Sequence, residues 1–335
     1  MLDSATSNKM RNTGIVAAIM VVTIHAQTHN CCCGFEKWWS ALVVDGLCRA
    51  AVPYFFMASG YLLARRYGEE GWYSTALASR VRSLLVPFLI WNLLAVAMTF
   101  GVEGIDGRSL TRVVGDILGI YPFSWPVHGP LWYVRSLLLY IIAAPLLLGA
   151  LSRHAGTLVI VAFMYFGSLL APRFLGTNVS AFINQFICVS GLFYFSLGAL
   201  IALRRRPIPA SGMKGGICFL LAALAVFAVC GIAPGFASQS TWHIVRKAGA
   251  LLVVAGIWSI VPATKWPSWL TGLAFPLYCI HVFPIFVFHH LGPLGCVGSP
   301  VSSILALTVS VVIHVAICSI LPKCVMRTIY GGRNA

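Results

Sequence analysis

A chain of 335 residues in which 59% are hydrophobic and only 9% are charged is far too apolar for a water-soluble domain, where about 25% of residues are usually charged. Its mean hydropathy of +0.88 indicates a polytopic membrane protein. The formal net charge of +15 does not favour nucleic-acid binding, because the basic residues are scattered between apolar segments instead of gathered on one soluble face.

Apolar segments bounded by charged residues, Gly or Pro predict ten membrane-spanning helices, since about 20 apolar residues cross the hydrocarbon layer. The predicted spans are residues 12–27, 41–64, 83–101, 131–150, 157–171, 183–203, 216–232, 245–262, 269–288 and 301–322. The sequence has no internal repeat and no loop long enough for a soluble domain. We therefore expect an all-α integral membrane bundle in which residues 1–335 form a single domain.

The distribution of basic residues predicts the orientation of this bundle. If the N-terminus is cytoplasmic, the inner segments hold fifteen of the 23 Lys and Arg residues, and the outer segments hold only Lys37, Arg108, Arg112 and Arg173. Cytoplasmic loops are generally rich in Lys and Arg, so both termini are predicted to be cytoplasmic. The N-terminal segment lacks the pattern of a cleaved signal peptide, and we expect the first span to be retained.

Several polar residues interrupt the predicted spans, where an ionisable group costs about 2.5–3.5 kcal/mol on insertion scales and so needs a partner or a function. With the predicted orientation they gather near the outer ends of their spans and predict a polar cavity there. These residues are His25, Asp45, Arg49, His128, Trp132, Tyr133, Arg135, Arg246, Lys247 and His281.

His25 is the first candidate for chemistry among them, because it closes an apolar run and the unperturbed pKa of histidine, near 6.5, allows proton exchange at neutral pH. Asp45 and Arg49 are spaced i,i+4, which suits either an ion pair within one helix or a catalytic pair. Arg246 and Lys247 either extend toward the membrane interface or bind substrate.

The eleven cysteines contain no C-x-x-C pair and have no adjacent histidine cluster, so no metal site is expected. Residues 31–33 are all cysteines, and they and Cys296 are predicted to lie in loops on the same outer side. A disulfide between these loops is one possibility in an oxidising compartment.

Five segments together resemble the acyltransferase 3 family, membrane enzymes that acylate sugars of surface polysaccharides, peptidoglycan and related acceptors. In the family's order, from about residue 12 to the end, the segments are IVAAIMVVTIHAQ with His25, CRAAVPYFFMASGYLLARR with Arg49, SRVRSLLVPFLIWNLL with Arg80 and Arg82, GPLWYVRSLLLYIIAAPLL with Trp132, Tyr133 and Arg135, and FPLYCIHVFPI with His281.

The chain departs from the family pattern at two places. Gly14 stands where many members carry an arginine, and Arg11 lies one turn earlier. Ser83 stands where the basic motif that begins at Arg80 usually has its second arginine, with Arg82 beside it.

The resemblance implies a multi-pass enzyme of the bacterial cytoplasmic membrane. Such an enzyme transfers an acyl group, expected to be acetyl, from a cytosolic thioester such as acetyl-CoA to a hydroxyl of an extracytoplasmic glycan or lipid-linked sugar. It is expected to have no bound cofactor and no nucleic-acid partner.

The same resemblance, with the positions above, gives each candidate residue a role. His25 is expected to be the general base, Asp45 to orient its ring, and Arg49 or Arg135 to stabilise the oxyanion. The acceptor is expected to contact Trp132, Tyr133, Arg135 and His281. The donor phosphates are expected to bind Arg80 and Arg82, since arginine pairs well with phosphate.

Two other function classes fit ten spans with polar residues. A transporter or flippase of a glycan or lipid-linked substrate would often show inverted repeats, which the sequence lacks. A non-catalytic assembly or sensor subunit would keep the fold without the chemistry, and Gly14 is a point in its favour. Within the enzyme hypothesis, the acyl group either passes directly through a narrow tunnel or travels on His25, His281 or a partner protein.

Overall fold

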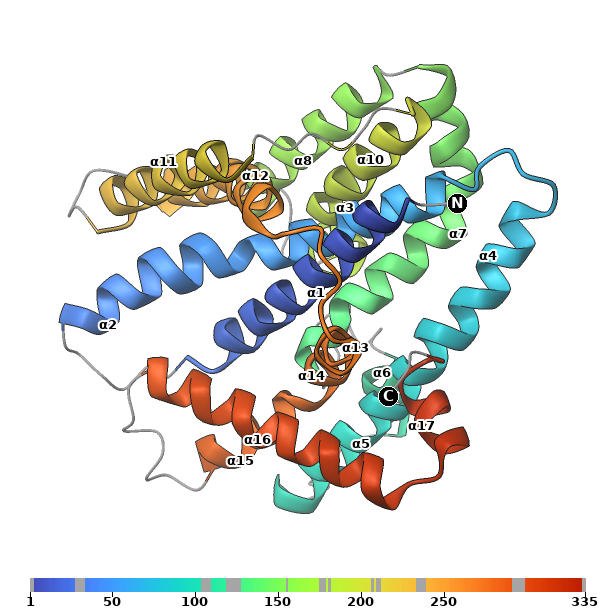
Figure 1. Ribbon diagram of the computed structural model, residues 1–335, viewed down its shortest axis with the longest axis vertical. Coiled ribbons are helices and arrows are strands. Elements are labelled where there is room, and N and C mark those ends of the chain that lie inside the picture. The colour runs from blue at the N-terminus through green and yellow to red at the C-terminus, as the bar shows by residue number, and fades with distance from the viewer. Residues whose placement is uncertain are drawn as a thin grey trace. The chain divides into compact units, whose positions relative to one another are not determined.

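The computed structural model is helical throughout the residues that it describes and contains no strand among them (Figure 1). The described residues are 3–27, 34–103, 110–118, 128–154, 156–174, 179, 182–205, 208, 212–232, 239–290 and 299–332. The predicted all-α class is therefore confirmed. The chain divides into unit 1, residues 1–55 and 208–320, and unit 2, residues 56–207 and 321–334.

Six helical segments in the described part of the chain are long and apolar enough to cross a membrane: Gly34–Ala64, Trp72–Val102, Gly129–Arg153, Phe182–Leu203, Gly212–Cys230 and Ser299–Ile320. The pair Ser268–Ile280 and Val282–His290, bent by 45°, makes a seventh if it counts as one span. Three further helices overlap the predicted spans 12–27, 157–171 and 245–262. The chain is thus a multi-pass membrane protein.

Unit 1 contains the first helices of the chain and most of the last ones. Its elements are α1 (Ser4–His25), α2 (Gly34–Trp38), the π-helical segment η1 (Trp39–Leu47), the short 3₁₀ turn η2 (Cys48–Ala50), the start of α3 (Ala51–Ala64), α11 (Gly212–Ile232), α12 (Gln239–Ile260), α13 (Ser268–Gly272), α14 (Ala274–Ile280), α15 (Val282–His290) and α16 (Ser299–Ile320).

Helix α1 is fixed within unit 1 at its beginning and along its apolar face. The Asp3 carboxylate caps it by accepting the Thr6 N–H at 2.7 Å. The buried Asn12 side chain donates to the carbonyls of Pro262 and Thr264, which follow α12. Further along, α1 contributes to a buried cluster with α14, α15 and α16, formed by Ile15, Val22, Ala26, Leu273, Leu277, Ile285 and Ala306. These contacts position the C-terminal end of α1.

The helices η1, α11 and α12 pack closely around Phe227, and α11 and α12 lie side by side (Figure 1). The ring of Phe227 is fully buried. A Cβ at either Gly46 or Gly249 would lie 2.6 Å from that ring, closer than van der Waals contact permits. Glycine at both positions therefore lets the η1 and α12 backbones approach α11, as small residues do in many membrane helix pairs.

Unit 2 contains the middle of the chain and its C-terminal helix. Its elements are the remainder of α3, α4 (Trp72–Arg80), the π-helical segment η3 (Val81–Leu85), α5 (Val86–Glu103), α6 (Leu110–Leu118), η4 (Gly129–Leu131), α7 (Trp132–Arg153), α8 (Thr157–Phe174), η5 (Phe182–Ile187), α10 (Val189–Leu203) and α17 (Lys323–Ile329).

Polar contacts join distant segments of unit 2. The Trp91 indole donates to the Ile329 carbonyl at 2.9 Å, which ties α5 to α17. The fully buried Asn92 side chain donates to the Ile117 carbonyl and accepts the His128 N–H. Buried amides of this kind satisfy backbone groups that the membrane cannot hydrate.

Candidate active site

The structure brings together two predicted site residues, His25 and His281. His25 is the last residue of α1, and His281 lies between α14 and α15; their ring centroids are 5.3 Å apart. His281 is fully buried, whereas His25 is half-buried. The Nδ1 of His281 lies 2.9 Å from the Leu277 carbonyl oxygen. A carbonyl can only accept, so Nδ1 carries the hydrogen and Nε2 of a neutral His281 is an acceptor.

Prolines explain why the chain bends at His281. A proline within a helix has no N–H to donate, and its ring clashes with the carbonyl four residues earlier. Four residues before Pro284 is Ile280, where α14 ends, and four residues before Pro276 is Gly272, where α13 ends. The two prolines therefore divide this segment into three short helices, and the second break leaves His281 at a bend of 45°.

A second cluster in unit 1 is an ion-paired trio. The Asp45 Oδ1 accepts from the Arg49 Nε at 2.9 Å and from the Arg246 Nη1 at 3.0 Å. The first contact confirms the i,i+4 ion pair expected from sequence, and the second joins η1 to α12. Asp45 and Arg246 are largely buried, with 24% and 16% of their side chains exposed, whereas Arg49 is 45% exposed.

The trio and His25 lie toward the same end of unit 1. Gln27, just after α1, donates to the Ser40 hydroxyl at 3.0 Å, and the Tyr54 hydroxyl donates to the Met10 carbonyl at 2.6 Å. These two contacts show that α1 runs antiparallel to the segment from η1 to α3. Asp45 is nearer to Ser40 than to Tyr54 along the chain, and it therefore lies beside the C-terminal half of α1.

Asp45 belongs to a π-helical segment, not to the regular α-helix that the apolar pattern of 41–64 predicts. A π-helical turn has a wider backbone and frequently occurs at functional sites. It shifts the residues that follow around the helix axis. The local conformation is thus one feature of this site that the hydrophobic pattern did not reveal.

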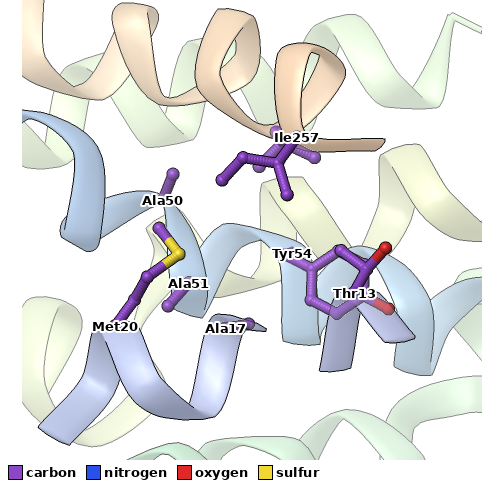
Figure 2. Close-up of a pocket in the computed structure, with 8 residues that line it drawn as sticks. Thr13, Ala17, Met20, Ala50, Ala51, Tyr54 and Ile257 are labelled. Atoms are coloured by element: carbon purple, nitrogen blue, oxygen red, sulfur yellow. The ribbon is translucent and has the colours of Figure 1, made fainter. Parts of the chain in front are cut away.

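A small crevice lies against the middle of α1. Its walls come from one face of α1 and from α3 and α12, with Thr13 and Met20 at its two ends (Figure 2). The lining residues are Thr13, Ala17, Met20, Ala50, Ala51, Tyr54, Val254 and Ile257. The crevice has room for about one water molecule, because the volume open to the centre of a water-sized sphere is about 10 Å³.

The crevice is apolar except at its Thr13 end. Within the part of the chain that the structure describes, the buried Thr13 Oγ1 has no hydrogen-bond partner, whereas the Tyr54 hydroxyl donates to the Met10 carbonyl. Ala50, on the opposite wall, follows Arg49 directly in the chain. The crevice therefore offers one hydrogen-bonding group and a small apolar space.

Three predicted substrate residues begin α7 in unit 2. The Tyr133 hydroxyl lies 3.0 Å from the Ser59 hydroxyl, and the rings of Trp132 and Tyr133 both contact Phe56. The guanidinium of Arg135, only 5% exposed, lies over the Phe186 ring at 4.9 Å from its centroid. These contacts hold all three side chains in defined positions within the unit.

The predicted donor-binding arginines also lie in unit 2. Arg80 ends α4 and is half-buried, and Arg82 is exposed on the π-helical segment η3. In unit 1, Gly14 is buried in α1, yet a Cβ there would meet no atom within 4 Å. The Arg11 side chain is exposed.

Two predictions concern metals and disulfides. The cysteines at 31–33 and Cys296 lie outside the residues that the structure describes. Within the described ranges, no group of three or more His, Cys, Asp or Glu side chains is placed to hold a metal ion.

Comparisons with known proteins agree with the family suggested by the sequence. The family model Acyl_transf_3, described as an acyltransferase domain, matches residues 15–321. The chain is also similar to the succinoglycan biosynthesis protein ExoH of Rhizobium meliloti (strain 1021), with 26% identity over 272 residues that cover 76% of this chain and 70% of that protein. No solved structure matches the chain. The protein therefore belongs to the acyltransferase 3 family of membrane acyltransferases.

Proposed function

We propose that this acyltransferase moves a short acyl group, expected to be acetyl, from a cytosolic thioester such as acetyl-CoA to a hydroxyl of an extracytoplasmic glycan or lipid-linked sugar. His25 is the general base in this proposal. The observation that carries it is the pairing of His25 with the buried His281, at a centroid distance of 5.3 Å. The similarity to ExoH, a succinoglycan biosynthesis protein, supports a polysaccharide acceptor.

The proposed role of His281 is to orient the ring of His25. Two imidazoles joined by an N–H···N hydrogen bond have centroids about 5 Å apart, because a bond of about 3 Å adds to about 1 Å between each nitrogen and its ring centroid. Among the described residues no hydrogen bond reaches Nε2 of His281, but the two rings are close, with centroids 5.3 Å apart, and we propose that such a bond forms when the acceptor binds. With Nε2 of His281 as the acceptor, one nitrogen of His25 donates and the other accepts the proton of the attacking hydroxyl.

Asp45 was expected from sequence to orient His25, as a carboxylate does in hydrolase triads. Its Oδ1 instead accepts from Arg49 and Arg246, so we assign the orienting role to His281 and give Asp45 the role of holding the two arginines. We propose that Arg49, the more exposed of the pair, stabilises the oxyanion. Arg135, the other sequence candidate for this role, lies in unit 2 and stays a prediction.

The proposed reaction has two proton transfers. His25 takes the proton from the sugar hydroxyl, and the oxygen attacks the thioester carbonyl to give a tetrahedral oxyanion beside Arg49. The carbon–sulfur bond then breaks, the acyl group stays on the sugar oxygen, and the departing thiolate takes the proton from His25. A direct transfer of this kind requires no acylated protein side chain.

We propose that the donor's thioester end reaches Arg49 by a narrow route, and that the Thr13 hydroxyl donates to its carbonyl; the crevice at Thr13 holds about one water molecule and does not itself form that route. We propose that Arg80 and Arg82 bind the donor phosphates. Trp132, Tyr133 and Arg135 are proposed to contact the acceptor. The donor is a substrate in this account, and the enzyme needs no resident cofactor.

The proposed setting is the bacterial cytoplasmic membrane, crossed ten times with both termini in the cytoplasm. The fifteen-to-four distribution of basic residues between inner and outer segments supports this orientation. The helices α1, α8 and α12 supply the three crossings beyond the seven described above. The family match over residues 15–321 supports the proposal that the whole chain acts as one membrane domain.

The proposed function is tested by mass spectrometry of surface glycans from three strains: the parent, a deletion strain, and the deletion strain expressing His25→Ala. We expect acylation to be lost on deletion, to return with the wild-type gene, and to stay lost with His25→Ala at equal membrane expression. His290→Ala, an exposed histidine on α15, is the matched control and should restore acylation. Full acylation with His25→Ala would refute the assignment of His25 as the base.

A further inference from the structure

Asn12 and Trp258, both in unit 1, each hold a buried polar atom that no described residue contacts by a hydrogen bond. These atoms are the Oδ1 of Asn12 and the indole Nε1 of Trp258. Asn12 is fully buried in α1, and Trp258 in α12 is only 8% exposed. A buried donor or acceptor without a partner lowers stability, so each one in a native protein needs an explanation. The proposed acyl transfer gives neither atom a role.

The two residues lie at the same end of the contact between α1 and α12. The Nδ2 of Asn12 donates at 2.9 Å to the carbonyl of Pro262, which follows Trp258 by four residues. Lys9, three residues before Asn12, holds its ammonium 5.2 Å from the centroid of the Trp258 ring. Residues three apart share one face of a helix, so the face of α1 that carries Lys9 and Asn12 packs against the end of α12 that carries Trp258.

The two atoms have complementary hydrogen-bonding roles. The Nδ2 of Asn12 is used by the carbonyls of Pro262 and Thr264, and the Oδ1 of the same amide can only accept. The indole Nε1–H of Trp258 can only donate. A ligand that satisfies both atoms must offer a donor and an acceptor close together. A carboxylate has no donor and an ammonium group has no acceptor, whereas a secondary amide has one N–H and one carbonyl.

The position of Asn12 and Trp258 favours the donor substrate over the acceptor. In the proposed orientation they lie toward the cytoplasmic ends of α1 and α12, where a cytosolic thioester enters. Thr13, which is proposed to contact the thioester carbonyl, directly follows Asn12 in α1. Coenzyme A carries its acyl group at the end of the pantetheine arm, a slender chain that contains secondary amides. The arm therefore supplies the chemical group that Asn12 and Trp258 lack.

We infer that Asn12 and Trp258 bind a secondary amide of the donor's pantetheine arm, with Oδ1 of Asn12 accepting its N–H and Nε1 of Trp258 donating to its carbonyl. The inference rests on the proposed function and names the part of the donor that unit 1 recognises. The Lys9 ammonium fixes the indole ring for this contact. The crevice at Thr13 holds only about one water molecule, so the arm binds as side chains between α1 and α12 move apart.

The first test measures acetyl transfer from acetyl-CoA by the full-length protein in lipid nanodiscs. Trp258→Phe removes the indole N–H and keeps an aromatic ring beside Lys9. At equal thermal stability it should raise the KM for acetyl-CoA about fivefold to tenfold, as expected for one hydrogen bond, and leave kcat and the acceptor KM nearly unchanged. Trp269→Phe, at an indole 70% exposed on α13, is the matched control and should behave as wild type. An unchanged KM in Trp258→Phe would overturn the inference.

Shorter donors show which part of the donor Trp258 contacts. S-acetylpantetheine keeps the amides but lacks the nucleotide, and ethyl thioacetate lacks both. The loss of kcat/KM caused by Trp258→Phe should be the same with S-acetylpantetheine as with acetyl-CoA, and it should disappear with ethyl thioacetate. An equal loss with ethyl thioacetate would mean that the substitution disturbs the protein and not an amide contact, and it would overturn the inference.

The role of Asn12 is tested on the wild-type protein with a changed donor. An analogue of S-acetylpantetheine in which ester oxygens replace the amide N–H groups keeps the shape of the arm but cannot donate to Oδ1. Its kcat/KM should be lower about fivefold or more, because the buried acceptor is then left without a partner. Equal rates with the two donors would indicate a bound water at Oδ1 and overturn the inference, while the proposed function stands. If wild-type protein transfers acetyl from none of these donors, the proposed function itself fails.

Discussion

The two ring nitrogens of His281 have different hydrogen-bonding roles. Because Nδ1 donates to the Leu277 carbonyl, Nε2 of the neutral ring can only accept, and the neighbouring ring is that of His25. A buried group with one fixed donor and one fixed acceptor can select the tautomer of its partner, as a carboxylate does in other enzymes. The pair is therefore the basis for proposing His25 as the general base with His281 as the residue that orients it.

Substitution of His281 tests this orienting role. His281→Leu, of similar size but without an acceptor, should lower kcat about tenfold to hundredfold, whereas His281→Gln, whose amide oxygen can accept, should retain more activity. The KM for acetyl-CoA should stay the same in both variants. A purely structural role for His281 predicts instead that the two variants lose activity in proportion to their loss of thermal stability.

Asp45 provides a second test at the level of a single residue. Asp45→Asn removes the carboxylate from the largely buried Arg246 and from the more exposed Arg49, and it should lower the free energy of unfolding by about 2 kcal/mol or more. The double variant Asp45→Asn with Arg246→Gln should recover part of this loss, since it removes one of the uncompensated charges. Thermal unfolding in detergent measures both effects. Equal stability of Asp45→Asn and wild type would contradict the ion-paired trio.

Irregular helices place the candidate residues in this protein. His281 lies at a proline-induced break, and Asp45 lies in the π-helical segment η1. The hydrophobic pattern predicted the apolar segments that contain both residues, because burial in lipid sets their length and composition. The pattern did not predict the π-helix, since apolar composition is the same for either kind of helix.

Pro284 is predicted to be necessary for the position of His281. Pro284→Ala restores a backbone donor and removes the clash with the Ile280 carbonyl, so it should straighten the helix, keep or raise the melting temperature, and lower kcat. Pro145→Ala, at the proline inside α7, is the control and should leave kcat unchanged. Loss of stability together with full activity in Pro284→Ala would contradict this account of the break.

At the scale of the whole molecule, the all-helical class and the multi-pass membrane character were predictable from composition and apolar segments alone. The Asp45–Arg49 ion pair was also predictable, because it depends on local spacing. The pairing of Asp45 with Arg246, 201 residues later in the chain, was not, and neither was that of His25 with His281. These contacts depend on which helices pack together, and no local rule of sequence specifies that packing.

The most direct test of the central claim is transfer of radiolabelled acetyl from acetyl-CoA to glycan purified from the deletion strain, catalysed by the full-length protein in lipid nanodiscs. We expect label in the glycan with wild-type protein and with His290→Ala. It predicts a rate lower by about 10²-fold or more with His25→Ala at equal thermal stability, as expected for loss of a general base. Transfer by His25→Ala at the wild-type rate would contradict it.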